Sequence, residues 1–417
     1  MPDTVPTPGR ALARRIGTTD AVVVGLSAML GAGVFVAFAP AASAAGSALL
    51  VSLGLAALIA FCNATSSAQL AAVHPSSGGT YLFGRVVLGP WWGFVAGWGF
   101  VIGKTASCSV MALAFAAYAV PGGGWWQRGA AAAAVALFTA ATLRGINRTA
   151  QVARVLLGVT GSVLVLVVLL SASREVVEAP DPLTGASTLG VLQAAGLLFF
   201  AFAGYARIAT LAEEVRRPEQ ISRAILVALG VTLAVYLAVA LVLVRTLGAD
   251  LASSATPLSD AVGAVGAGWA RPAVRVGAAA AALGALLALL VGVSRTTLAM
   301  ARERDLPAWL ASVSDRHRVP DHAQLAVGVA VVVLVLSVDL RGAIGFSSFG
   351  VLTYYFVANA AAWRQPAGER RWPQALQLLG MSGCLVLVGT LPGPSVLAGL
   401  AVLAVGLLGR LALRRPR

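Results

Sequence analysis

The sequence predicts an all-α integral membrane protein, and three observations carry this prediction. The chain has 417 residues, 59% of them hydrophobic and only 11% charged, and its mean hydropathy is +0.86. Soluble domains carry about 25% charged residues. The apolar residues gather in segments of about 20 residues, the length at which a helix crosses a bilayer. We therefore interpret 1–417 as a single transmembrane domain built from helices.

Twelve membrane-spanning helices are expected, each a mainly apolar segment flanked by polar or basic loops. Their approximate bounds are 19–38, 45–71, 92–119, 127–143, 152–171, 190–211, 223–247, 273–298, 324–339, 343–363, 374–391 and 395–412. Of the 30 Lys and Arg residues, 21 fall on the N-terminal side of the membrane and 6 on the other side. Because cytoplasmic loops carry the excess of Lys and Arg, both termini are expected in the cytoplasm and the protein in the cytoplasmic (inner) membrane.

The net charge of +14 and the pI near 11.1 would also suit a nucleic-acid-binding protein. The positions of the charges argue against that class, because most of the basic residues lie in short loops between apolar segments. The three cysteines lack the spacing of metal ligands, and the three histidines lie in polar loops, so no metal or cofactor is expected. An enzyme site inside the membrane would need His, Asp, Glu or a Ser–His set at that depth. The cores of the predicted spans contain none, and we expect no enzymatic activity.

The first span is interrupted by small residues at Gly31, Ala32 and Gly33. A helix in lipid must satisfy its own backbone groups, so a loosened segment at mid-membrane is tolerated only where it lines a cavity in the protein. Small residues at short spacing also let helices pack closely, which is the alternative interpretation. A corresponding break elsewhere in the chain would favour a binding site.

The sixth span supplies such a break at Ala203 and Gly204, where aromatic residues flank small ones and Arg207 follows. Pairs of Gly-interrupted spans at corresponding positions indicate the binding site of secondary transporters. Helices one and six lie five spans apart, and an odd offset gives two halves of opposite orientation. The sequence thus predicts a 5+5 inverted repeat. The repeats are expected at about 19–171 and 190–363, followed by two extra helices at about 374–412.

Five motifs, in order along the chain, resemble those of the amino acid–polyamine–organocation (APC) superfamily of transporters. They are Gly31–Phe35 in helix one, Pro75–Tyr81 after helix two, Phe199–Tyr205 in helix six followed by Glu213, Glu214 and Pro218, Ser294–Pro307 at the end of helix eight, and Val319–Pro320 with Ala323 before helix nine. The resemblance covers nearly the whole chain. It implies a leucine-transporter-like inverted-repeat fold with helices one and six broken. It also implies a permease that binds an amino acid between these helices and works by alternating access.

The resemblance places the substrate site at the two breaks. The expected substrate-binding residues are Ser27, Gly31, Ala32, Gly33, Ser107, Phe200, Ala201, Phe202, Ala203 and Gly204. Backbone N–H groups at Ala32 and Gly33, at the positive end of a half-helix, suit the carboxylate of an amino acid. Carbonyls around the second break suit its α-ammonium. Phe202 is the expected aromatic gate, whereas Phe200 and Tyr205 are equally open to interpretation as core residues.

The substrate class follows from the acidic residues, all sixteen of which fall outside the cores of the predicted spans, with Asp20 and Asp339 at span ends. Superfamily members with cationic substrates often carry a carboxylate just past the glycine of helix six, where this chain has Ala206. A buried cationic side chain would lack a counter-charge here. We therefore expect a neutral amino acid as substrate. A permease for cationic amino acids or polyamines and a transporter-like sensor are the alternatives, and the particular amino acid and the direction of transport stay open.

Coupling residues are expected in the interior of the bundle. Similar transporters use a lysine of helix five in place of sodium, but this chain has Thr160 there, and its single lysine, Lys104, lies in helix three. An ionisable residue at membrane depth is a functional hypothesis by default, so Lys104 is assigned to coupling or to the substrate site. Snorkelling to an interface and a bond to carbonyls of a broken helix are the alternatives. Arg207 is expected to gate or anchor helix six. Protons, exchange and sodium stay open, as do a monomer and a homodimer.

Overall fold

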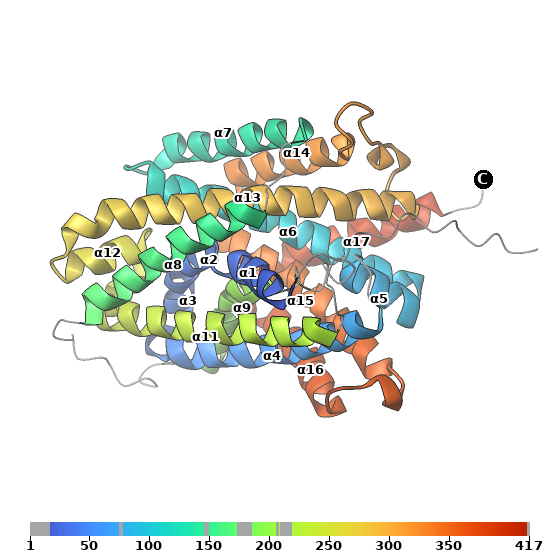
Figure 1. Ribbon diagram of the computed structural model, residues 1–417, viewed down its shortest axis with the longest axis horizontal. Coiled ribbons are helices and arrows are strands. Elements are labelled where there is room, and N and C mark those ends of the chain that lie inside the picture. Colours follow the sequence, from blue (N-terminus) through green and yellow to red (C-terminus); the bar gives the residue numbers. More distant parts are fainter. Residues whose placement is uncertain are drawn as a thin grey trace, which may run out of the picture.

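The computed structural model describes residues 17–74, 78–145, 150–172, 186–205, 208 and 219–414. The regular structure of this part of the chain is helical, and the long helices lie side by side in one bundle (Figure 1). The α-helices are α1 (Thr18–Met29), α2 (Gly33–Val36), α3 (Phe38–Ala45), α4 (Leu49–Val73), α5 (Gly79–Val87), α6 (Pro90–Ala119), α7 (Gly124–Leu143), α8 (Ala150–Ala172), α9 (Thr188–Phe202), α11 (Glu219–Leu247), α12 (Pro257–Ala264), α13 (Arg271–Arg302), α14 (Asp321–Ser337), α15 (Leu340–Arg364), α16 (Gln374–Thr390) and α17 (Gly393–Leu413). The all-α architecture expected from the sequence is confirmed.

Seven stretches of the described chain are long and apolar enough to cross a membrane. They are Thr18–Val36, Phe38–Val73, Pro90–Ala119, Arg154–Ala172, Gln220–Ser253, Gly268–Arg302 and Gly393–Leu413. Apolar helices of 10–17 residues are found at Thr188–Phe202, Asp321–Ser337 and Gln374–Thr390. These stretches are distributed along the chain from one end to the other, as in a multi-pass membrane protein.

Local sequence fixes where several helices begin. The Ser187 hydroxyl accepts a hydrogen bond of 3.0 Å from the N–H of Gly190 and so caps α9. The Asp339 carboxylate caps α15 in the same way through the N–H of Gly342, also at 3.0 Å. Both side chains satisfy N–H groups that have no partner within the helix. Pro90 begins α6, where the missing N–H of proline costs no helical bond.

The first span is broken where the sequence predicts. Helix α1 ends at Met29, and helical structure resumes at Gly33. From there α2 and α3 run as one bent helix to Ala45, because the N–H of Ala37 still bonds the carbonyl of Gly33 at 2.9 Å. The expected end of this span at residue 38 is therefore wrong. Pro40 does not stop the helix, since it lies in the first turn of α3, where proline is tolerated.

The sixth span is also broken where the sequence predicts. Helix α9 ends at Phe202, and 203–205 form a turn. The N–H of Ala203 bonds the carbonyl of Phe200 at 3.4 Å, which is the tighter pattern of a helix end. Residue 208 is again helical, and residues 206, 207 and 209–211 of the expected span over 190–211 lie outside the described residues. Arg207 lies outside the described residues.

Two further segments differ from expectation. The segment after helix two forms a helix of its own, α5, which the sequence analysis did not anticipate. The polar segment 248–269 lies between two predicted spans. Helix α12 is there, but Leu258, Ala261 and Val262 are buried, so one face packs into the bundle. Both helices are short, and a hydropathy pattern tuned to spans of about 20 residues does not detect them.

The core of the bundle is the close pairing of α6 with α15. Glycines permit it, because a Cβ added at Gly103 would lie 3.0 Å from the backbone carbonyl oxygen of Ser347. A Cβ at Gly350 would likewise lie 2.7 Å from the Cα of Gly103. Small residues allow this approach in membrane helices generally. The contact fixes α6, and with it the direction in which Lys104 leaves the helix.

An ionic cluster, here called the Asp305 cluster, ties three elements together at one end of the bundle. The Asp305 side chain is fully buried and accepts hydrogen bonds from Tyr81 Oη at 2.9 Å, Arg85 Nη1 at 3.0 Å, Arg410 Nε at 2.9 Å and Arg414 Nη2 at 3.0 Å. The donors come from α5 and from the C-terminal end of α17, and Asp305 directly follows α13. Burial and the neighbouring Asp305 raise the pKa of Tyr81, so its phenol stays protonated as a donor. Figure 1 shows α12 at the opposite end of the bundle.

Candidate functional site

The two breaks lie against each other at the centre of the bundle. A Cβ added at Gly204 would lie 2.5 Å from the carbonyl carbon of Ala28 and 2.6 Å from its oxygen. A Cβ added at Gly33 would lie 3.0 Å from the Cα of Ala201. Real Cβ atoms do not tolerate the first of these contacts, so glycine is needed for the backbones to meet. The structure thus brings together the two interruptions that the sequence analysis singled out.

Three carbonyls at this junction accept hydrogen bonds from buried side chains. Lys104 Nζ of α6 donates to the carbonyl of Ala203 at 3.1 Å. The hydroxyl of Tyr236, on α11, lies 2.6 Å from the carbonyl oxygen of Met29 and 2.9 Å from that of Ala201. A hydroxyl carries one proton and donates it to one acceptor at a time. The junction therefore has more acceptors than these two side chains fully satisfy.

Tyr236 is the site residue that the sequence analysis missed. It is fully buried in the middle of a long aliphatic helix, and its hydroxyl links the end of α1 to the end of α9. Its ring packs edge-on against Phe202, with centroids 5.0 Å apart. A signal was available, since a buried tyrosine hydroxyl usually has a hydrogen-bond partner and lipid offers none.

Lys104 lies too deep in the bundle to reach either membrane surface. It is 8% exposed and stands near the middle of α6, about 21 Å along the helix from each end. The four-carbon side chain cannot span that length, so the snorkelling alternative is wrong. Among the described residues no carboxylate pairs with it, and its contact is the carbonyl of Ala203. The alternative of a bond to a broken helix therefore describes the geometry, and the same geometry places Lys104 at the candidate substrate site.

A small cavity adjoins the first break. It measures about 10 Å³, and Ser27, Gly31, Thr160 and Ala281 are among its lining residues. The volume is about that needed for one water molecule. Ser27 donates its hydroxyl to the carbonyl of Val24 at 2.9 Å. The structure thus places Thr160, the candidate coupling position of helix five, beside Ser27 and Gly31.

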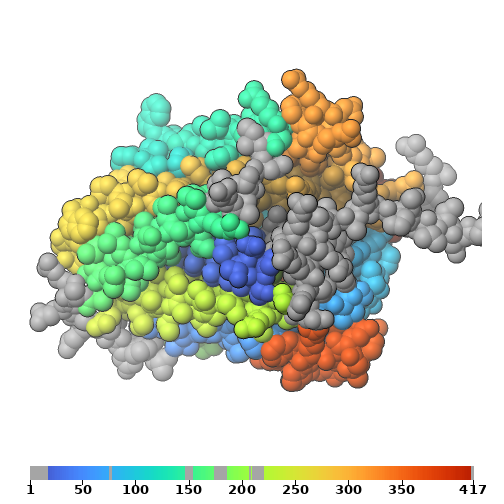
Figure 2. Space-filling view, viewed as in Figure 1, coloured from blue at the N-terminus to red at the C-terminus, as the bar shows by residue number. Residues whose placement is uncertain are grey.

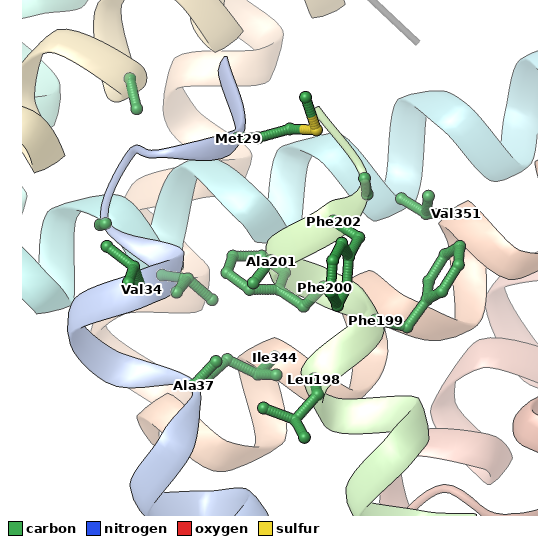
Figure 3. Close-up of a cluster of buried hydrophobic side chains, with 14 of the residues drawn as sticks. Met29, Val34, Ala37, Leu198, Phe199, Phe200, Ala201, Phe202, Ile344 and Val351 are labelled. Carbon is green, nitrogen blue, oxygen red and sulfur yellow. The ribbon is translucent and has the colours of Figure 1, made fainter. Parts of the chain in front are cut away.

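The aromatic residues of α9 point in different directions (Figure 3). A Cβ at Gly33 would lie 3.6 Å from Cε1 of Phe200, so the Phe200 ring faces α2. Phe199 faces α15 and packs edge-on against Tyr355 at 5.8 Å between centroids. Phe202 is fully buried beside Tyr236. Phe200 and Phe202 therefore both line the junction, one from each side of the end of α9.

Ser107 lies one turn beyond Lys104 on α6, but its side chain contacts α15 and not the break after α9. Its hydroxyl lies 2.8 Å from that of Ser347 on α15 and 3.1 Å from the carbonyl oxygen of Gly103, its acceptor. This bond joins α6 to α15 next to the junction.

A larger, open groove of about 710 Å³ lies outside this junction, between α1 and α8. Its lining is mainly apolar and includes Val23, Leu157 and Leu169. Figure 2 shows part of α1 (blue) at the surface between α8 (green) and α11 (yellow-green). We place the site at the junction because the groove lacks clustered polar groups.

Known proteins resemble this chain along nearly its whole length. The family described as amino acid permease matches residues 16–406. An uncharacterized transporter of Mycobacterium tuberculosis is 52% identical, over 97% of this chain and 93% of its own. The branched-chain amino acid permease BcaP of Bacillus subtilis is 24% identical, over 94% and 87%. Cationic amino acid transporter 7 of Arabidopsis thaliana is 26% identical, over 86% of this chain and 66% of its own.

These relatives are transporters and not enzymes, in agreement with the sequence analysis. The match to the family covers most of the chain, including both breaks and the residues around them. The chain therefore belongs to the amino acid permease family, as a multi-pass membrane transporter.

Proposed function

We propose that the protein moves neutral amino acids across the cytoplasmic membrane by alternating access, coupled to protons or to exchange. The observation that carries this proposal is the backbone contact between the two breaks, at Gly33 with Ala201 and at Gly204 with Ala28. Broken helices at such a junction offer N–H groups for a carboxylate and carbonyls for an ammonium. Every zwitterionic amino acid carries this pair of groups.

The proposed architecture has twelve spans, with helices one to five and six to ten related by inversion and two further helices outside the repeat. The interruptions after Met29 and after Phe202 support it, because they fall in the first span of each half. We assign the end of the bundle that holds the Asp305 cluster to the cytoplasm, together with both termini. Three arginines meet there, in keeping with the positive charge of cytoplasmic loops.

The neutral substrate class is supported by the charges around the junction. Among the described residues the carboxylates of Asp20, Glu303 and Asp305 pair with arginines at helix ends, away from the breaks. Within the described ranges, Lys104 is a charged side chain that reaches the junction, and no carboxylate there would offset the charge of a cationic substrate beside it. The relative named as a branched-chain amino acid permease agrees with this class. The relative named as a cationic amino acid transporter makes cationic substrates the alternative.

The coupling ion is proposed to be a proton, with exchange as the other mode. Lys104 can release and take up a proton, and it reaches the broken helix directly. Sodium is the competing ion, since the residues lining the cavity include Ser27 and Thr160, whose hydroxyl oxygens are possible ligands. Uptake measured with sodium replaced by choline, with and without an imposed pH gradient, separates the two ions.

The test of the function uses purified protein in detergent and in liposomes. A bound ligand raises the melting temperature by mass action. Neutral amino acids are expected to stabilise the protein and to be taken up by the liposomes. Stabilisation by arginine or polyamines would establish the cationic alternative, and binding without uptake would indicate a sensor. If no amino acid moves under any gradient or against any internal amino acid, the proposal is wrong.

A further inference from the structure

The amino group of Lys104 occupies a position suited to the ammonium of an amino acid. Its Nζ lies 3.1 Å from the carbonyl oxygen of Ala203, one of the carbonyls expected to bind that group. Lys104 carries the same chemical group as the substrate would, a primary amine that donates to a backbone carbonyl. A substrate ammonium and Lys104 therefore compete for one acceptor.

Two other carbonyls beside the second break, those of Phe200 and Ala201, are already engaged by the protein. The carbonyl of Phe200 accepts from the N–H of Ala203, and that of Ala201 shares the Tyr236 hydroxyl with Met29. The cavity beside the first break, about 10 Å³, has room for a water but not for an amino acid. Admission of a substrate requires side chains at the junction to withdraw. Lys104 is suited to this movement because its four-carbon stem is flexible.

We propose that Lys104 is a tethered counterpart of the substrate ammonium, which a bound amino acid displaces from the carbonyl of Ala203. This inference rests on the proposed function. When the substrate displaces Lys104, its ammonium takes over the hydrogen bond to the carbonyl of Ala203. The released Lys104 ammonium then pairs with the substrate carboxylate. Each buried polar group keeps a partner before and after binding, as a low-dielectric interior requires.

This displacement of Lys104 by the substrate also makes Lys104 a residue that determines specificity. A neutral amino acid brings one carboxylate to pair with Lys104 and one ammonium to replace it. A substrate with a cationic side chain brings a second positive charge, which no carboxylate near the junction balances in the described part of the chain. Like charges at this depth repel strongly. Lys104 thus selects amino acids without a cationic side chain.

A direct test follows from the composition, since Lys104 is the single lysine of the chain. Lysine labelled with ¹³C at Cε gives one side-chain NMR signal in the purified, wild-type protein. Leucine is the probe, with the melting temperature recorded on the same samples. We expect the chemical shift of this signal to change saturably as leucine is added. The midpoint concentration should equal that of the increase in melting temperature. A signal that stays fixed while leucine stabilises the protein would overturn the inference and leave the proposed function intact.

A variant tests the specificity. Lys104→Met keeps the length of the side chain and removes its charge. The ratio of arginine affinity to leucine affinity is expected to rise at least about tenfold, from removal of the like charge. Arg295→Met is the control, because Arg295 is an exposed cation of α13 and its loss should leave the ratio unchanged.

An unchanged ratio in Lys104→Met would overturn the selectivity role. Should Lys104→Met fail to fold, competition by arginine and leucine for the wild-type NMR signal decides the same point. Leucine alone is expected to shift it, and an equal shift by arginine counts against selectivity. If no amino acid stabilises or is transported by wild-type protein, the proposed function itself fails.

Discussion

Two buried polar clusters in this protein satisfy their hydrogen bonds in opposite ways. In the Asp305 cluster one carboxylate accepts four hydrogen bonds, all within 3.0 Å. At the junction one lysine and one tyrosine hydroxyl serve three carbonyls, those of Met29, Ala201 and Ala203. A carboxylate with four donors gains nothing by rearranging. At the junction the single Tyr236 proton serves two carbonyls, and the Lys104 ammonium, with three protons, has one carbonyl contact, so both can accept further groups from a ligand. The first cluster is therefore an anchor and the second a site.

The largest effect is expected from removing the anchor. Asp305→Ala leaves Arg410 buried without its partner, and loss of one member of a buried ion pair costs about 3–5 kcal/mol. The melting temperature in detergent should fall steeply, while the order of preference among substrates stays the same. Glu303→Gln is the control, because the Glu303 side chain is 53% exposed in its pair with Arg85. Equal, small shifts for the two variants would contradict the role of Asp305 as an anchor.

The next largest effect is expected at the junction itself. Gly33→Leu inserts a side chain where even a Cβ would lie 3.0 Å from the backbone of Ala201, and such overpacking costs about 1–3 kcal/mol. Uptake into liposomes should be lost although the protein still inserts into the membrane. Gly54→Leu is the matched control, since an added Cβ at Gly54 meets nothing within 4 Å. If Gly33→Leu retains uptake, transport does not depend on the close backbone contact at this break.

A smaller effect is expected from the hydroxyl that bridges the two breaks. Tyr236→Phe takes the donor from both Met29 and Ala201, and an unsatisfied buried acceptor costs about 1–3 kcal/mol. Leucine affinity and uptake should both decrease. Tyr118→Phe is the comparison, because that hydroxyl donates to a single carbonyl, that of Phe35, at 3.0 Å and bridges no break. If the two substitutions weaken leucine binding equally, bridging the breaks has no special role.

The smallest effect is expected for the exposed ion pair between α1 and α8. Arg154 and Asp20 lie 2.7 Å apart, with side chains 53% and 43% exposed. Such pairs contribute about 0–1 kcal/mol and weaken with salt. Arg154→Gln should change the uptake rate only slightly, and any difference from wild type should vanish at high salt. A large loss of uptake rate that does not depend on salt would contradict the small contribution expected of this exposed pair.

Much of the fold was readable because membrane helices carry strong local signals. The breaks at Gly31 and Gly204 were recognisable because glycine beside small residues loosens a helix that lipid would otherwise keep continuous. The end of the first span was misplaced at residue 38, because a span of about 20 residues was expected and the bent helix continues to Ala45. Helix α5 was missed because its sequence is too short to register as a span.

The candidate site was readable only in part. Lys104 attracted attention as a lone cation in an apolar segment, but its partner Ala203 lies 99 positions away and has no side-chain signal. Tyr236 was missed for a similar reason, because its acceptors are backbone carbonyls, which every residue possesses. In a hydrogen bond from a side chain to a distant backbone carbonyl, the donor is a recognisable residue type, but the acceptor can be any residue.

Local composition alone established that this chain lies in a membrane, where its first and sixth spans are interrupted, and that its acidic residues lie outside the cores of the predicted spans. These properties depend on local composition, which lipid constrains strongly. The tertiary structure decided which groups meet: Lys104 with Ala203, Tyr236 with two breaks at once, and Asp305 with three arginines. These contacts depend on how the helices pack, since their partners are far apart in the chain and close only in the folded bundle.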